Sequence, residues 1–192
     1  MRPATLVLVA AALALALAGC GGPLGPTEAG GDAADPVALL TILPSPGALR
    51  GRPATAADPD ELQRALTGVD DPELADRIRA RAPSAAGVRS WTGPDGQTMT
   101  AAVSVWDSHL VATGVGSDIA AALAGDGGEA WTPADSPGSR GARRKAPDRR
   151  ELRLARSVGP NAVYVRATGP VPEDVVIRTL ERMAFQLEHG AG

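Results

Sequence analysis

The sequence has little of the chemistry that usually marks an active site. Among 192 residues there is one cysteine, Cys20, so no disulfide can form within the chain. The histidines are His109 and His189, and aromatic residues make up only 3% of the chain. The core must therefore be built from Val, Leu, Ile and Ala, each of which buries less area than an aromatic ring.

Metal and cofactor motifs are also missing from the sequence. There is no cysteine–histidine spacing of the zinc type and no Asp-x-Asp-x-Asp-Gly loop of the calcium type. Residues 114–119 resemble a dinucleotide fingerprint loosely, but Ile119 stands at the third glycine position and the segment lies within a helical pattern. The sequence predicts neither a metal site nor a cofactor.

One short segment holds the residue types of a hydrolase. Asp107, Ser108 and His109 are consecutive, yet a catalytic triad is assembled across a fold, and the Gly-x-Ser-x-Gly turn is absent. Capping of a helix by Asp107 or Ser108, beside a surface histidine, explains the same residues. We therefore expect no catalytic residues, and an envelope hydrolase remains the least favoured alternative.

The first nineteen residues have the pattern of a secretion signal. Arg2 precedes an apolar run from Leu6 to Ala18, and small residues follow. The run is well short of the roughly 20 residues that a membrane-spanning helix needs. We expect this segment to be removed rather than to form part of the fold.

Leu17-Ala18-Gly19-Cys20 resembles the lipobox of bacterial lipoproteins. The resemblance implies that Cys20 becomes the first mature residue and carries membrane lipid, including acyl chains such as palmitate. The protein would then be anchored to the cell membrane on its extracytoplasmic side. Eighteen arginines against the single Lys145, with abundant Ala and Gly, resemble the usage of an actinobacterium.

The remaining chain divides into a tether and one domain. Residues 20–36 are rich in Gly, Pro and Asp, which predicts a flexible tether after Cys20. Residues 37–190 are predicted to form a single domain. Within it, Val37–Leu43 is a candidate edge strand because prolines end it.

Local patterns predict an α+β fold with an antiparallel sheet. Asp58-Pro59 and Asp71-Pro72 begin two short helices, since an aspartate caps each and proline suits the first helical position. Two strand–strand–helix units follow, with helices packed on the sheet they form. The predicted segments are strands 87–92 and 97–106, a helix from 109 to before Gly125, a loop over 125–141, strands 151–158 and 162–167, and a helix over 172–190.

The hairpin turn at 93–96 leaves one register open. A slip of one residue decides whether Trp91 faces the side of Met99 and Val103 or the side of Trp106.

A basic segment is the other candidate binding feature. Eight cations fall within residues 140–156, and arginine binds phosphate and carboxylate groups in pairs of hydrogen bonds. The candidate residues for an anionic partner are Arg140, Arg143, Arg144, Lys145, Arg149 and Arg150. On an extracytoplasmic protein, the partner would be anionic lipid or a cell-wall polymer rather than nucleic acid. The alternative is a solvated loop and a polar strand face, balanced by the acidic N-terminal helices.

These observations favour a non-catalytic binding or interaction module anchored at the cell envelope, with a protein partner unknown. A carrier or receptor for a small molecule or lipid is the alternative. It would need an apolar pocket of several hundred Å³ between the sheet and the helices.

Overall fold

The computed structural model describes residues 50–51, 53–145 and 150–189. The chain divides into two units, Met1–Gly30 and Gly31–Gly192, and every described residue belongs to the second. The predicted signal segment, Cys20, the tether, the candidate strand Val37–Leu43 and Arg149 lie outside the described residues. Within the described ranges, no helix combines the length and apolarity that crossing a membrane requires.

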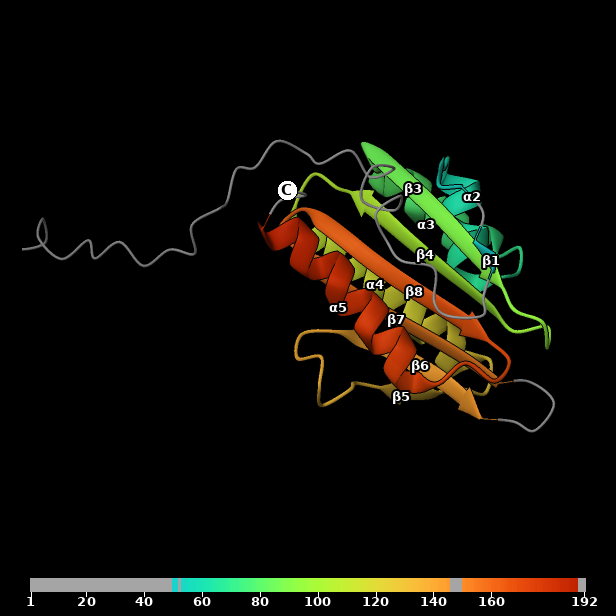
Figure 1. Ribbon diagram of the computed structural model, residues 1–192. Coiled ribbons are helices and arrows are strands. Elements are labelled where there is room, and N and C mark those ends of the chain that lie inside the picture. The colour runs from blue at the N-terminus through green and yellow to red at the C-terminus, as the bar shows by residue number, and fades with distance from the viewer. Residues whose placement is uncertain (1–49, 52, 146–149, 190–192) are drawn as a thin grey trace, which may run out of the picture. The chain divides into compact units, whose positions relative to one another are not determined.

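One eight-stranded sheet, antiparallel throughout, organises the described unit (Figure 1). Its order is β1-β3-β4-β8-β7-β6-β5, and β2 also pairs with β3. The predicted α+β class and the antiparallel sheet are confirmed. The strands are β1 Arg50–Gly51, β2 Thr55–Ala56, β3 Ala85–Thr92, β4 Thr98–Val105, β5 Glu129–Trp131, β6 Arg140–Lys145, β7 Arg150–Val158 and β8 Asn161–Thr168.

Both predicted hairpins are present and lie in the same sheet. β3 pairs with β4, β7 pairs with β8, and the β4–β8 pairing joins the two hairpins. Trp91 stands opposite Met99, which settles the open register. Trp91 accordingly lies in one hydrophobic cluster with Met99 and Val103, whereas Trp106 belongs to the cluster on the other face.

The helices begin where the sequence predicts. α2 (Pro59–Thr67) is capped by the Asp58 side chain, and α3 (Pro72–Arg81) by that of Asp71. Ser108 rather than Asp107 caps α4 (His109–Gly125). α5 (Glu173–His189) follows β8. Each cap satisfies backbone N–H groups that have no partner within the helix.

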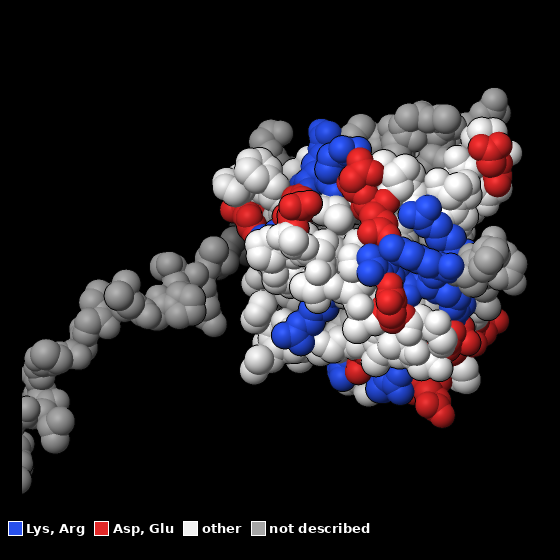
Figure 2. Space-filling model, turned by 90° about the horizontal axis from the view of Figure 1, so that it is seen from below, with Lys and Arg blue, Asp and Glu red and all other residues white. Residues whose placement is uncertain are grey.

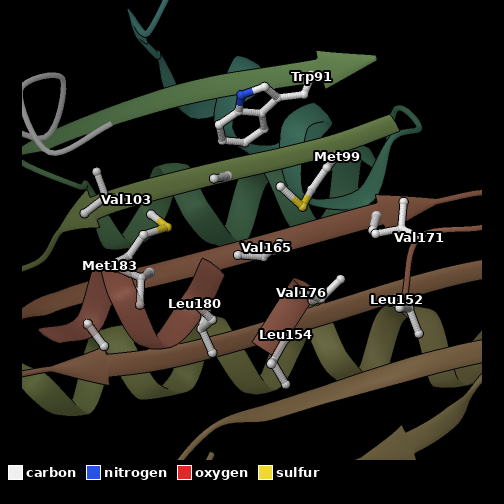
Figure 3. Packing of buried hydrophobic residues seen from close by; sticks show 14 of the residues in the cluster. Trp91, Met99, Val103, Leu152, Leu154, Val165, Val171, Val176, Leu180 and Met183 are labelled. Carbon is white, nitrogen blue, oxygen red and sulfur yellow. The ribbon is translucent and has the colours of Figure 1, made fainter. Parts of the chain in front are cut away.

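Helices cover both faces of the sheet. α5 lies on one face, and α2, α3 and α4 lie on the other (Figure 1). In Figure 3, Val176, Leu180 and Met183 project from α5 toward the strand residues Val165 and Leu154. Because both faces are covered, the central strands are buried almost continuously, which explains the weak alternation of β7.

The predicted loop over 125–141 is wrong in part. Glu129–Trp131 forms β5, and β6 begins at Arg140. The glycines and prolines around β5 give no strand pattern in the sequence. Tertiary contacts stabilise the strand instead, because Trp131 is buried in the hydrophobic cluster that includes α5.

Gly68, at the end of α2, is constrained both by its backbone conformation and by a neighbouring side chain. Its φ is +74°, the left-handed conformation that favours glycine. A Cβ at Gly68 would also collide with the guanidinium group of Arg166. Gly96 has the same φ of +74° but nothing within 4 Å of such a Cβ.

These two glycines make a matched pair for a stability measurement. Gly96→Ala should cost about 1 kcal/mol of unfolding free energy, because only the left-handed backbone is strained. Gly68→Ala should cost about 2 kcal/mol more, because Arg166 is displaced from its buried partners. Urea unfolding of both variants checks this, and equal losses would contradict the packing of Arg166 over Gly68.

Candidate functional site

Much of the predicted basic segment is paired within the domain. Arg143 bonds Glu129 and lies 3.4 Å from Glu173, and the Lys145 Nζ lies 2.9 Å from Glu173. Hydrogen bonding to Lys145 is the main reason that the pKa of Glu173 falls below its ordinary value. On the face shown in Figure 2, several cationic side chains lie together, and acidic side chains border them.

Four residues of this region form a cluster of charge, here called the Glu151 cluster, in which three members are buried and Arg166 is partly exposed: Glu151, Arg144, Arg153 and Arg166. The Nε atoms of Arg153 and Arg166 both donate to Glu151 Oε1 over 2.9 Å. Glu151 is only 1% exposed and Arg153 only 4%. One carboxylate thus holds cations from β6, β7 and β8 against the sheet.

The remaining positive charge of the Glu151 cluster faces the end of α2. Arg153 Nη2 donates to the backbone carbonyl of Thr67 over 2.8 Å, and the Arg166 guanidinium lies over Gly68. The last carbonyls of a helix carry partial negative charge, so they suit these cations. On the outer side, Arg144 Nη2 lies 2.7 Å from a carboxylate oxygen of Asp126.

The protonation of Glu151 follows from these contacts. Burial raises the pKa of its carboxyl, but the charges and hydrogen bonds of Arg153 and Arg166 outweigh burial and hold the pKa below its ordinary value. Burial likewise lowers the pKa of Arg153, and the Glu151 carboxylate opposes that shift. The two groups therefore keep each other charged.

Removing the Glu151 charge should be costly. Glu151→Gln leaves buried arginines without their carboxylate, so we expect a loss of about 3–5 kcal/mol in unfolding free energy. Glu73→Gln is the control, because Glu73 is 88% exposed and its pairing with Arg77 across one helical turn should be worth less than about 0.5 kcal/mol. Denaturant unfolding at neutral pH measures both.

The same pair of proteins gives a pH test. Because the pKa of Glu151 is lowered in the folded protein, its contribution to stability is full above the pKa of the unfolded chain and is lost as pH falls through the folded value. The difference in unfolding free energy between the wild type and Glu151→Gln should therefore become smaller only under acidic conditions. A difference that stays constant down to pH 3 would contradict this assignment.

Ion pairs between the basic segment and the acidic N-terminal helices were the alternative that the sequence offered, but those described cations of the segment that form ion pairs do so with other acids. The basic segment pairs with acids from residue 126 onward. The acids of α2 and α3 pair locally instead: Arg79 bonds Asp60 and Asp76, linking the two helices. Arg81 reaches Asp118 of α4 over 2.6 Å.

A pocket of about 330 Å³ lies between α4 and β7, near the first residue of β6. We call it the α4–β7 pocket. β6 last pairs with β7 at Arg140 opposite Ala155, so residues 156–158 have a strand partner only on β8. The pocket lies beside this unpaired edge of β7. Its lining residues are His109, Thr113, Gly116, Pro137, Gly138, Arg140, Ala155, Arg156 and Ser157.

Two of the polar side chains that line the α4–β7 pocket, His109 and Thr113, have fixed partners. His109 Nδ1 lies 3.1 Å from the carbonyl oxygen of Gly159. A carbonyl can only accept, so this geometry assigns the proton to Nδ1. The Thr113 hydroxyl donates to Ser157 Oγ over 3.1 Å, joining α4 to β7.

Pro137 and Gly138, which form one side of the pocket, follow a residue that is bonded to α5 on the opposite face of the sheet. The Ser136 hydroxyl and the Arg156 guanidinium both donate to the Glu181 carboxylate of α5. Arg156 also donates to Glu188 over 2.7 Å. Ser136 is fully buried, so the loop before β6 is anchored next to the pocket.

Arg140 differs from Arg143, Arg144 and Lys145, the other cations of β6. It is exposed at the start of β6 and lines the α4–β7 pocket. Within the described ranges it forms no ion pair, and no Asp or Glu is among the lining residues. Of the six predicted anion-binding residues, the structure thus separates Arg140 from Arg143, Arg144 and Lys145, while Arg150 is half-buried at the start of β7.

The hydrolase interpretation finds a cleft but no carboxylate beside His109. His109 lines the α4–β7 pocket, yet its Nδ1 is bonded to a backbone carbonyl, and Asp107 is not in the lining. His189 lies on α5 and bonds the backbone of Phe185. Over the part of the chain that is described, no group of His, Cys, Asp or Glu could hold a metal ion.

Sequence reasoning singled out His109 and Arg140 but missed the pocket around them. Thr113, Ser157 and the Pro137–Gly138 wall come from three separate segments that only the fold unites. One local signal was present: Gly116, a glycine within the helical pattern of residues 114–119, is where α4 approaches β7 closely. A Cβ there would lie 3.1 Å from the Ala155 Cβ.

The comparisons with known proteins give a likeness of structure but none of sequence family. No protein-family model matches the sequence, and no curated protein matches it. Among solved structures, the chain is similar to the extracellular domain of PknH from Mycobacterium tuberculosis. The TM-score is 0.47 at 11% sequence identity, over 79% of this chain and 88% of that chain.

Proposed function

We propose that this protein is a lipid-anchored, non-catalytic binding module on the extracytoplasmic side of the cell membrane. The anchor is inferred from the lipobox-like segment Leu17-Ala18-Gly19-Cys20 and the apolar run before it. Two or more acyl chains give stable attachment, because each buried methylene contributes about 0.8 kcal/mol.

The α4–β7 pocket is the observation that supports binding. Its volume of about 330 Å³ falls at the lower end of the range of ligand pockets. The Ser136–Glu181–Arg156 contacts hold its wall, and the Thr113–Ser157 bond ties its two sides together. A preformed pocket loses little freedom on binding, which favours recognition.

The composition of the lining favours a polar ligand over a lipid. A lipid carrier needs a predominantly apolar cavity, whereas the lining of this pocket is divided about equally between apolar and polar surface. The polar lining residues are His109, Thr113, Arg140, Arg156 and Ser157. Non-catalytic binding is favoured over hydrolysis because the histidine has a backbone partner in place of a carboxylate.

Cys20→Ser tests the anchor. In an actinobacterial host, the wild-type protein should sediment with membranes and be degraded by protease added outside the cell. Cys20→Ser should leave the membrane pellet, because serine cannot take the lipid.

A thiol measurement controls for misfolding of the variant. Cys20 is the only thiol in the chain, so the denatured mature wild type should not react with a maleimide once its sulfur carries lipid. A reactive thiol in the membrane-bound protein, or a Cys20→Ser protein that still sediments, would overturn the proposed anchor.

A further inference from the structure

We infer that the α4–β7 pocket binds a small soluble molecule through a carboxylate or phosphate group, with Arg140 supplying the charge. This inference rests on the proposed binding function and narrows it to one class of ligand. It concerns Arg140, His109, Thr113 and Ser157, whose side chains come together only in the fold.

The charge at the pocket is the first argument. Arg140 is exposed, and among described residues it has no carboxylate partner. Arg156 is different, since Glu181 and Glu188 of α5 already neutralise it from the other face of the sheet. With no acid in the lining, Arg140 leaves an unbalanced positive charge at the pocket, and a guanidinium group pairs well with a planar or tetrahedral oxyanion.

The direction of the hydrogen bonds is the second argument. Ser157 Oγ accepts the Thr113 proton, so the hydroxyl proton of Ser157 remains available for a ligand. His109 Nδ1 is used by Gly159, which fixes the ring beside the pocket. The pocket therefore offers donors from Arg140 and Ser157, and a ligand that mainly accepts hydrogen bonds would satisfy them.

The shape of the pocket limits the ligand to a small solute. Gly116 and Ala155 bring α4 so close to β7 that even a methyl group at Gly116 would touch the strand. The pocket of about 330 Å³ has room for a small organic acid or a phosphate monoester, but not for a pair of acyl chains.

The two histidines make the proposal measurable. In the mature chain carrying Cys20→Ser and ¹³C-labelled histidine, His109 reports on the pocket, and His189, stacked on Phe185, serves as an internal control. At fixed pH and ionic strength, succinate, inorganic phosphate or glycerol 3-phosphate should shift the His109 ring signal in a saturable way. The His189 signal should stay in place.

Arg140→Gln should weaken this binding about tenfold, as expected for loss of one charge-assisted contact. Arg64→Gln is the matched control, because Arg64 is also an exposed arginine but lies on α2. It should leave the titration unchanged. Equal weakening by both variants would show a general charge effect and overturn the role of Arg140.

Two further outcomes separate this inference from the proposed function. If glycerol shifts the His109 signal as much as glycerol 3-phosphate does, the pocket binds a small solute, but the inference that the ligand is an anion is wrong. If phosphatidylglycerol vesicles shift His109 at lower phosphate concentrations than glycerol 3-phosphate, the ligand is a headgroup and the soluble solute is wrong. Absence of any saturable shift overturns the inference and leaves the membrane anchor standing.

Discussion

The described part of the fold depends on one buried carboxylate. Glu151 holds Arg153 and Arg166 at 2.9 Å within a sheet that is covered on both faces. A buried guanidinium is costly unless it is paired and fully hydrogen-bonded, so these cations need both Glu151 and the carbonyl end of α2. The same contacts set where α2 sits, because Arg153 bonds Thr67 and Arg166 covers Gly68. The Glu151 cluster thus links α2 to the centre of the sheet.

This constraint changes the meaning of the basic segment. In the sequence, eight cations close together suggest a surface for an anionic partner. In the fold, four of them lie on β6, where Glu129, Glu151 and Glu173 pair with Arg143, Arg144 and Lys145. Arg140 stands at the strand's first position, beyond the reach of these acids. The proposed anion site follows from this division, since Arg140, which pairs with no described acid, lies beside the α4–β7 pocket.

The sequence predicted what local chemistry determines. Asp58 and Asp71 mark helix starts because a cap acts within three residues, and Gly93-Pro94-Asp95-Gly96 marks a turn for the same reason. β5 and β6 were missed because Trp131 and the arginines of β6 find their partners far along the chain. The pocket was missed likewise: His109 was noticed beside Asp107 and Ser108, its sequence neighbours, whereas the groups that surround it are Thr113, Ser157 and Arg140. The spacing of residues along the sequence does not predict that these side chains line one pocket.

A double-mutant cycle between Glu151 and Arg166 tests the central claim most directly. The unfolding free energies of the wild type, Glu151→Gln, Arg166→Gln and the double variant would be measured at neutral pH. If the two side chains form one buried unit, the cost of the double variant should fall short of the sum of the single costs by about 1.5 kcal/mol or more. Costs that add to within about 0.5 kcal/mol would mean that the residues act independently, and the account of the sheet built around Glu151 would be wrong.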